Sequence, residues 1–107
     1  MPYQIEYYVE CSGSMPFPEW LEALRDRQAK ARIMQRLYRL ELEHFGDCKP
    51  CHDGVWELRI DTGPGYRVYY AKSGRRLILL LCAGDKQSQA ADIRRACDYW
   101  RNWQARQ

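Results

Sequence analysis

Two neighbouring runs of the chain alternate hydrophobic and polar positions at the two-residue period of a β-strand. The turn signal Gly63-Pro64-Gly65 separates the two runs and predicts a hairpin. A third run, residues 77–82, is apolar at every position, which is typical of a central strand covered on both faces. The apolar rows of the first two runs are Trp56, Leu58 and Ile60, and Tyr66, Val68 and Tyr70. The pattern predicts three adjacent strands that bury their apolar rows together.

The polar positions of the same strands fall on the opposite face of the hairpin. Period two places Glu57 and Arg59 in one strand beside Arg67 and Tyr69 in the next. The polar surface continues after the third strand, in residues 83–86. We therefore expect these side chains to form one surface that binds a ligand.

Elsewhere the chain contains one further strand and two helical regions. Alternation predicts a strand at residues 3–9, and helical spacing predicts helices within residues 17–45 and 87–103. The polar residues 25–28 divide the first helical region in two, and residues 46–54 form a loop. The expected order is β-α-α-β-β-β-α. This order predicts an α+β fold, a small, mostly antiparallel sheet with helices packed on one face and the other face partly open.

Length and composition fit a single globular domain, residues 1–107, with 46% hydrophobic residues and a core that needs no disulfide. Basic residues exceed acidic ones by 17 to 14, and thirteen of the basic residues are arginine. Arginine pairs with phosphate oxygens two at a time, so this excess favours an anionic polymer partner such as RNA.

The first residues show no basic start followed by an apolar run, and no segment approaches the roughly 18 apolar residues that would span a bilayer. These features predict a cytoplasmic protein with no membrane partner. The five cysteines are then expected to be mostly reduced thiols.

A series of motifs carries a family resemblance along nearly the whole chain. The motifs are FPEWL at residues 17–21, GVWELRI at 54–60, GPGYRVYY at 63–70, GDKQSQ at 84–89 and Asp92-Ile93. With them the chain resembles the RelE/HigB superfamily of bacterial toxins, in particular the phage-derived Gp49-like branch, also called addiction module killer proteins.

This resemblance implies the RelE-like microbial ribonuclease toxin fold and the toxin role in a type II toxin-antitoxin system. Such a toxin enters the ribosomal A site and cuts mRNA without a metal or other cofactor. A ribose 2′-OH attacks the adjacent phosphate and leaves a cyclic phosphate and a free 5′-OH. The reaction needs a proton acceptor, a clamp for phosphate charge and a proton donor. The implied antitoxin is a small helix-turn-helix, HigA-like protein.

The resemblance also implies roles for the polar surface. The catalytic candidates are Arg67 and Lys86 at the phosphate, with Glu57 or Asp85 as proton acceptor, and the RNA-binding candidates are Arg59 and Tyr69. Each has a plainer alternative, since an arginine can pair with a nearby carboxylate and an aspartate before a helix commonly caps it. No metal ligand is assigned.

The first helical region adds a basic face. If residues 17–45 are treated as one ideal helix, Arg25, Arg32, Arg36 and Arg39 lie opposite a broad apolar sector. The resemblance makes Arg32, Arg36 and Arg39 candidates for contact with ribosomal RNA, whereas an ordinary amphipathic helix would simply solvate them. The apolar sector consists of Trp20, Leu24, Ala31, Met34, Tyr38, Leu42 and Phe45.

One departure from the family concerns the last helix. Relatives use a tyrosine there at the reacting centre, whereas this chain has Ala90-Ala91-Asp92, and Tyr99 lies too far along to replace it. The general base is therefore open. A second hypothesis follows, in which the protein binds antitoxin, RNA or ribosome without cleaving.

The sequence Cys48-Lys49-Pro50-Cys51-His52 matches the C-x-x-C-H pattern of haem attachment, and with His44 it offers four zinc ligands. Haem attachment requires export, which the first residues do not predict. A zinc-dependent structural domain stays open as a third hypothesis beside a pair of reduced loop cysteines.

Overall fold

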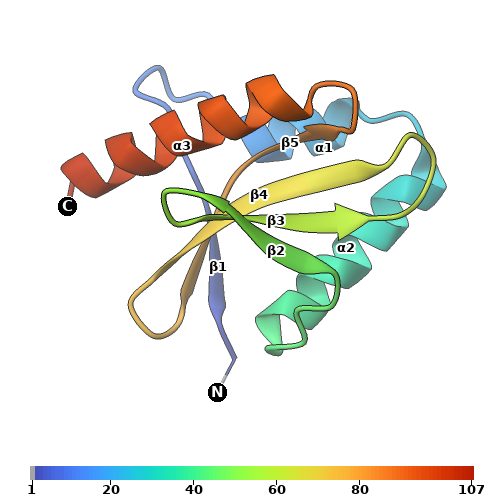
Figure 1. The fold of residues 1–107 in the computed structure, drawn as a ribbon, viewed down its shortest axis with the longest axis horizontal. Helices are drawn as coiled ribbons and strands as arrows, with labels where there is room; N and C mark the ends of the chain where they lie inside the picture. The colour runs from blue at the N-terminus through green and yellow to red at the C-terminus, as the bar shows by residue number, and fades with distance from the viewer. Residues whose placement is uncertain (1) are drawn as a thin grey trace.

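Five strands form one sheet at the centre of the computed structural model, which describes residues 2–107 (Figure 1). Their order across the sheet is β1-β5-β4-β3-β2. β1 and β5 are parallel, and the other neighbouring pairs are antiparallel. The elements are β1 Gln4–Tyr7, α1 Pro16–Ala23, α2 Arg27–Glu41, β2 Cys48–His52, β3 Val55–Ile60, β4 Tyr66–Ser73, β5 Leu77–Asp85 and α3 Gln89–Ala105. The α+β fold class is confirmed.

The chain has one strand more than predicted, because β2 lies in the expected loop. β2 is an edge strand that pairs only with β3, with an irregularity between Pro50 and His52. An edge strand is paired on one side only, so it tolerates a proline that has no N–H to donate. Its residues also lack an apolar alternation, which is why the pattern did not predict it.

Both faces of the sheet are covered, which corrects the expectation that all helices pack on one face. On one side α1 and α2 pack against a core that contains Leu58, Val68 and Ile78. On the other side α3 packs through Ala96 and Trp100 against alternate strand residues. Figure 1 shows α3 and α2 on opposite sides of the strands. The fully apolar run in β5 had predicted a strand covered on both faces, and that is confirmed: Ile78 and Leu80 face one core, and Leu79 and Leu81 the other.

The predicted break between the first two helices is confirmed. α1 ends at Ala23, and Asp26 caps α2 by accepting a hydrogen bond from the Ala29 backbone N–H at 3.1 Å. The break restarts the helical rotation, so one wheel drawn through residues 17–45 misplaces the second half. Within residues 2–107 none of the helices is long and apolar enough to cross a membrane.

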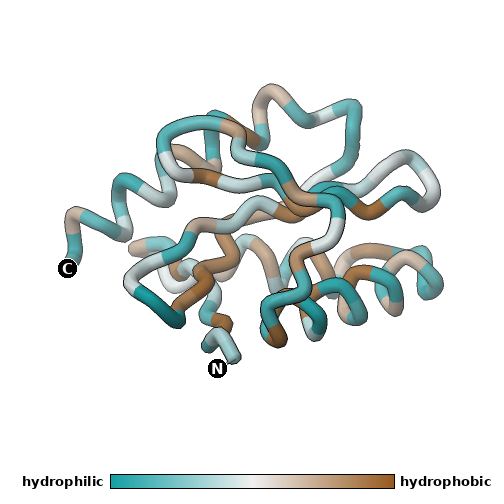
Figure 2. The backbone as a smooth tube through the Cα atoms, turned by 60° about the horizontal axis from the view of Figure 1, so that its bottom comes forward, coloured by the Kyte–Doolittle hydropathy of each residue, from teal (hydrophilic) through white to brown (hydrophobic). Residues whose placement is uncertain are grey.

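α2 consequently buries a different stripe from the predicted one. Met34 and Tyr38 are 51% and 63% exposed, and Leu42 is exposed as well. Figure 2 shows hydrophobic and hydrophilic positions alternating along this helix. The residues that face the sheet are Ala29, Ile33, Leu37 and Leu40, which are three or four residues apart and so lie on one helical face.

The junction between β5 and α3 is closely packed around Gly84. The Ser88 hydroxyl donates to Asp92 Oδ2 at 2.5 Å, and Asp92 Oδ1 pairs with Arg95 at 3.2 Å. A Cβ on Gly84 would overlap Asp92 Oδ2 and lie 2.7 Å from Ser88 Oγ. Only glycine therefore lets α3 begin directly against the end of β5.

We expect Gly84→Ala to lower the free energy of unfolding by about 1–3 kcal/mol, because the added methyl group must displace the buried Asp92 carboxylate. Urea denaturation of the purified protein measures the change. Gly74→Asn is the matched control, since Gly74 has open space around its Cβ position and asparagine tolerates its positive φ. Equal stability of the Gly84 variant and the wild type would contradict the steric argument.

Candidate active site

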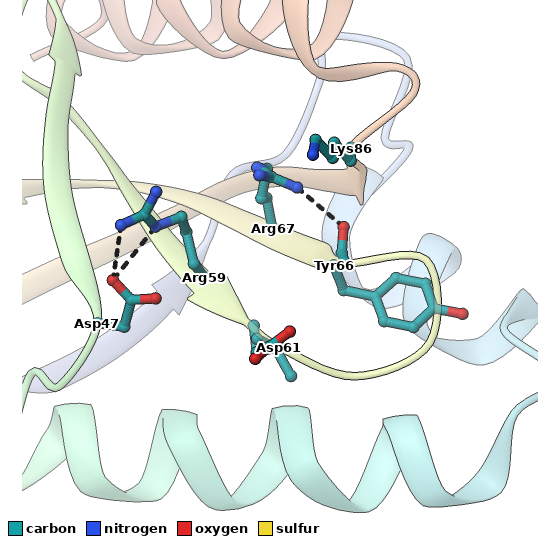
Figure 3. A pocket seen from close by; sticks show the side chains of 8 residues that line it. Asp47, Arg59, Asp61, Tyr66, Arg67 and Lys86 are labelled. Atoms are coloured by element: carbon teal, nitrogen blue, oxygen red, sulfur yellow. Dashed lines mark hydrogen bonds and ion pairs between the residues drawn. The ribbon is translucent and has the colours of Figure 1, made fainter.

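A pocket of about 240 Å³ lies where β3 and β4 meet at their connecting turn, beside the end of β5 (Figure 3). Three cationic side chains and two carboxylates line it. The lining residues are Asp47, Arg59, Ile60, Asp61, Gly65, Tyr66, Arg67 and Lys86. The structure thus brings together Arg59, Arg67 and Lys86, which the sequence had placed on one surface.

Strand register explains why the two arginines are neighbours. Arg59 of β3 and Arg67 of β4 occupy directly opposite positions, and Gly84 of β5 is the partner of Arg67 on its other side. Opposite residues of antiparallel strands hold their Cβ atoms about 5 Å apart, and like charges in such pairs repel. Each guanidinium is accordingly held by a carboxylate of its own.

Arg67 forms an ion pair with the buried carboxylate of Glu57. The Arg67 Nε atom lies 3.6 Å from Glu57 Oε2, and the Arg67 side chain is 12% exposed while that of Glu57 is 0% exposed. The same carboxylate oxygen accepts a 2.8 Å hydrogen bond from Gln89 Nε2 of α3. Arg67 Nη1 also donates to the Gly65 carbonyl at 3.0 Å. The remaining guanidinium N–H groups are available to a ligand in the pocket.

Arg59 forms a hydrogen-bonded ion pair with Asp47. Arg59 donates to Asp47 Oδ1 from Nε at 3.2 Å and from Nη2 at 3.0 Å. This hydrogen bond, and then the carboxylate charge, raise the pKa of Arg59. With its side chain 38% exposed, Arg59 faces solvent at the pocket rim and is partly engaged before any ligand binds.

Lys86, Asp61 and Tyr66 complete the rim. Lys86 is exposed and follows β5 directly, whereas Asp61 is exposed and follows β3. The Tyr66 ring is buried, packs edge-on against Trp20 with centroids 5.8 Å apart, and burial raises its pKa. Figure 3 shows the Tyr66 hydroxyl pointing away from Arg67 and Lys86.

Three of the six residues predicted for the polar surface of the sheet lie outside the pocket. Glu57 is fully buried beneath Arg67, so it has no path to a substrate proton. Tyr69 is also fully buried, its ring cannot stack on a base, and burial raises the pKa of its hydroxyl. Asp85 Oδ1 accepts the backbone N–H groups of Gln87 and Ser88 at 2.9 and 3.1 Å, so it closes the turn just before α3, whose N-cap residue is Ser88.

The three arginines of α2 have different environments. Arg36 turns toward the sheet and donates to the Arg59 carbonyl at 2.5 Å and the Phe45 carbonyl at 3.1 Å. It therefore holds the loop that carries Asp47, which gives this arginine a structural role. Arg32 and Arg39 are exposed, and nothing in the structure tests a contact with RNA at these two positions.

The two cysteines of the C-x-x-C-H segment lie on opposite faces of the sheet, so they are not placed to bind one metal ion. Cys48 packs with the core under α1 and α2, whereas Cys51 packs with the core under α3. Burial raises the pKa of Cys51 to about 11 and also raises that of Cys48, so both thiols are protonated near neutral pH. Within residues 2–107 no group of three or more side chains is arranged to hold a metal ion. The strand geometry thus opposes the zinc hypothesis.

The last helix offers no substitute for the missing tyrosine. Asp92 is buried and engaged with Ser88 and Arg95. Tyr99 stacks on Tyr8 with ring centroids 4.5 Å apart. Two pocket residues that sequence reasoning had not selected are Asp47 and Asp61. Asp61 continues the alternation of Glu57 and Arg59, and extending the period by one step beyond the strand would have found it.

The fold and the pocket together define a small α+β domain with a cationic site at one end of its sheet. Comparison with known proteins agrees with this class. Residues 19–96 match the family model described as phage derived protein Gp49-like. An uncharacterized protein of Haemophilus influenzae is 44% identical over 88 residues, which cover 82% of this chain and 89% of the relative.

The chain belongs to the Gp49-like family, which is part of the toxin-antitoxin-related RelE/HigB-like group. This membership implies an antitoxin partner. The resemblance drawn from the motifs is thereby confirmed at the level of the family.

The buried pair of Glu57 and Arg67 leads to a stability prediction. We expect Glu57→Gln to lower the free energy of unfolding by about 3 kcal/mol, because it leaves the Arg67 charge without its buried partner. Urea denaturation measures the loss. The double variant Glu57→Gln/Arg67→Met should regain part of it, since both charges are then absent. If the loss in the double variant equals the sum of the losses in Glu57→Gln and Arg67→Met alone, the two charges do not stabilise each other.

Arg36 leads to a second prediction. Arg36→Ala removes charged hydrogen bonds to the Arg59 carbonyl of β3 and the Phe45 carbonyl of the loop before β2, and we expect a loss of about 1.5–3 kcal/mol in unfolding free energy. Arg39→Ala is the matched control on the same helix, because Arg39 is exposed, and its change should stay within about 0.5 kcal/mol. If the unfolding free energy of Arg36→Ala equals that of the wild type, a role of Arg36 in binding is favoured instead.

Proposed function

We propose that this protein is the toxin of a type II toxin-antitoxin system and a ribosome-dependent mRNA endoribonuclease. The observation that carries the proposal is the pocket in which Arg67, backed by Glu57, lies beside Arg59 and Lys86. Three cationic groups around one small cavity fit a phosphodiester whose negative charge grows during reaction. Membership of the Gp49-like family supports the same reaction class.

In this proposal Arg67 is the phosphate clamp. A guanidinium that is hydrogen-bonded to the Gly65 carbonyl and paired with a buried carboxylate needs little reorganisation when charge develops on the phosphate. Lys86, which lies beside Arg67 just after the end of β5, donates a proton to the leaving 5′ oxygen. Arg59 binds the RNA backbone at the rim, where its contact with Asp47 leaves one face toward solvent.

The proposed substrate is mRNA held in the ribosomal A site, and the proposed regulator is a helix-turn-helix, HigA-like antitoxin. Both act in the cytoplasm. Arg32 and Arg39, exposed on α2, are proposed contacts to ribosomal RNA. The reaction uses side chains of the protein and requires no metal or other cofactor.

The test uses purified protein, programmed ribosomes and a defined mRNA, with 5′ ends mapped by primer extension. We expect Arg67→Ala to slow cleavage roughly 10²–10³-fold, the usual loss when a group that stabilises developing charge is removed. Lys86→Ala should slow it as well. Arg94→Ala is the matched control, since Arg94 is an exposed arginine of α3 outside this pocket.

Three outcomes separate the hypotheses. Cleavage by the wild type that depends on Arg67 supports the proposal, and induced expression should then stop growth. Growth arrest and ribosome binding with intact mRNA ends favour the binding module without cleavage. Cleavage at wild-type rate by the Arg67→Ala/Lys86→Ala double variant would refute the site assignment.

A further inference from the structure

The proposed reaction needs a proton acceptor for the ribose 2′-OH, and the pocket offers few groups for this task. An acceptor must reach the substrate and must have an oxygen or nitrogen free to take the proton. The guanidiniums and the ammonium of the pocket are already protonated. The remaining candidates are the carboxylates, Tyr66 and the two histidines.

Three nearby carboxylates are already committed to the structure. Glu57 is buried under Arg67 and receives the Gln89 hydrogen bond. Asp47 receives two hydrogen bonds from Arg59 on one oxygen. Asp85 caps the turn before α3 and does not line the pocket. Each of these groups would give up a structural contact in order to serve as a base.

Tyr66 and the histidines are excluded by position. Figure 3 shows the Tyr66 hydroxyl outside the cluster of cations, and burial raises its pKa, so it holds its proton near neutral pH. His52 is the last residue of β2, paired with Val55 at the start of β3, and it lines a different pocket beside α3. His44 does not line the cationic pocket.

Asp61 differs from all of these groups. It lines the pocket, it is exposed, and within residues 2–107 its carboxylate makes no hydrogen bond or ion pair. It follows β3 two positions after Arg59, and alternate positions of an extended chain lie on one face roughly 6–7 Å apart. That spacing leaves room for a phosphodiester between the carboxylate and the cations.

Backbone hydrogen bonds of the turn between β3 and β4 hold Asp61 in its place at the pocket. Asp61 starts the turn between β3 and β4, in which Thr62 N–H donates to the Ile60 carbonyl at 3.0 Å and Gly65 N–H to the Thr62 carbonyl at 3.0 Å. Ile60 and Tyr66 form the last strand pair directly before and after this turn. The carboxylate is thus carried by a hydrogen-bonded turn at the end of a rigid hairpin, and no bond has to break before it acts.

We propose that Asp61 is the general base of the reaction, an inference that rests on the proposed function. Asp61 takes the proton of the ribose 2′-OH, and the 2′ oxygen forms a bond to the adjacent phosphorus. The bond from phosphorus to the 5′ oxygen breaks, and that oxygen takes a proton from Lys86. The products are a 2′,3′-cyclic phosphate and a 5′-OH. Asp61 then returns its proton to water, and Lys86 regains one from water.

The charged groups that face Asp61 across the pocket are Arg59, Arg67, Lys86 and Asp47. The first three attract the ionised carboxylate, and Asp47 is largely offset by its contact with Arg59. A base that must be ionised makes the cleavage rate fall at acid pH, as the carboxylate takes up its proton.

The experiment compares wild type and Asp61→Asn on programmed ribosomes under single-turnover conditions across acid to neutral pH. We expect Asp61→Asn to lower the maximal cleavage rate roughly 10²–10⁴-fold and to remove the acid limb of the rate profile. The half-saturating concentration of ribosome complex should change little, because the clamp cations remain. Asp98→Asn is the matched control, since Asp98 is an exposed carboxylate of α3 outside the pocket and should keep both rate and profile.

The outcomes distinguish this inference from the proposed function. If the wild type leaves the mRNA intact, the proposed function fails, and the assignment of a base fails with it. If the wild type cleaves and Asp61→Asn cleaves at the same rate with the same acid limb, only the role of Asp61 is overturned. A variant that loses ribosome binding but keeps the acid limb would likewise show that Asp61 binds and does not accept the proton.

Discussion

The contact between Glu57 and Arg67 is the interaction on which the site depends. A carboxylate without solvent exposure is tolerated inside a protein only when a positive charge and hydrogen bonds compensate it, and here Arg67 supplies the charge and Gln89 the hydrogen bond. The hydrogen bond from Arg67 Nη1 to the Gly65 carbonyl orients the guanidinium beside this buried charge. One pair of side chains therefore contributes both to folding stability and to the positive charge of the pocket.

α3 packs next to this ion pair because the sheet is apolar on both faces and the helix covers one of them. The helix covers one core through Ala96, Cys97 and Trp100, and its first residue, Gln89, touches the carboxylate under the site. Packing places the N-terminal end of α3 beside Gly84, where a side chain has no room. The position of the helix thus follows from core packing and also supports the pocket.

The sequence predicted much of this fold, and the failures have physical causes. Period two placed Arg59 and Arg67 side by side, because strand alternation is a local property. The edge strand β2 was missed since pairing on one side demands little of its sequence. Alternation also put Glu57 and Tyr69 on the polar face, but it carries no information about a helix arriving from later in the chain. Burial of these two residues required tertiary structure.

The parallel pairing of β1 with β5 joins two segments that are far apart in the sequence, with Gln4 beside Leu77. Such a pair closes a long loop, which is entropically unfavourable until the hairpin of β3 and β4 and the adjoining β5 already exist. Lys86 and Gln89 come later still. A chain that is being synthesised therefore cannot assemble the pocket until most of it has left the ribosome, and its cationic site is among the last parts of the molecule to form.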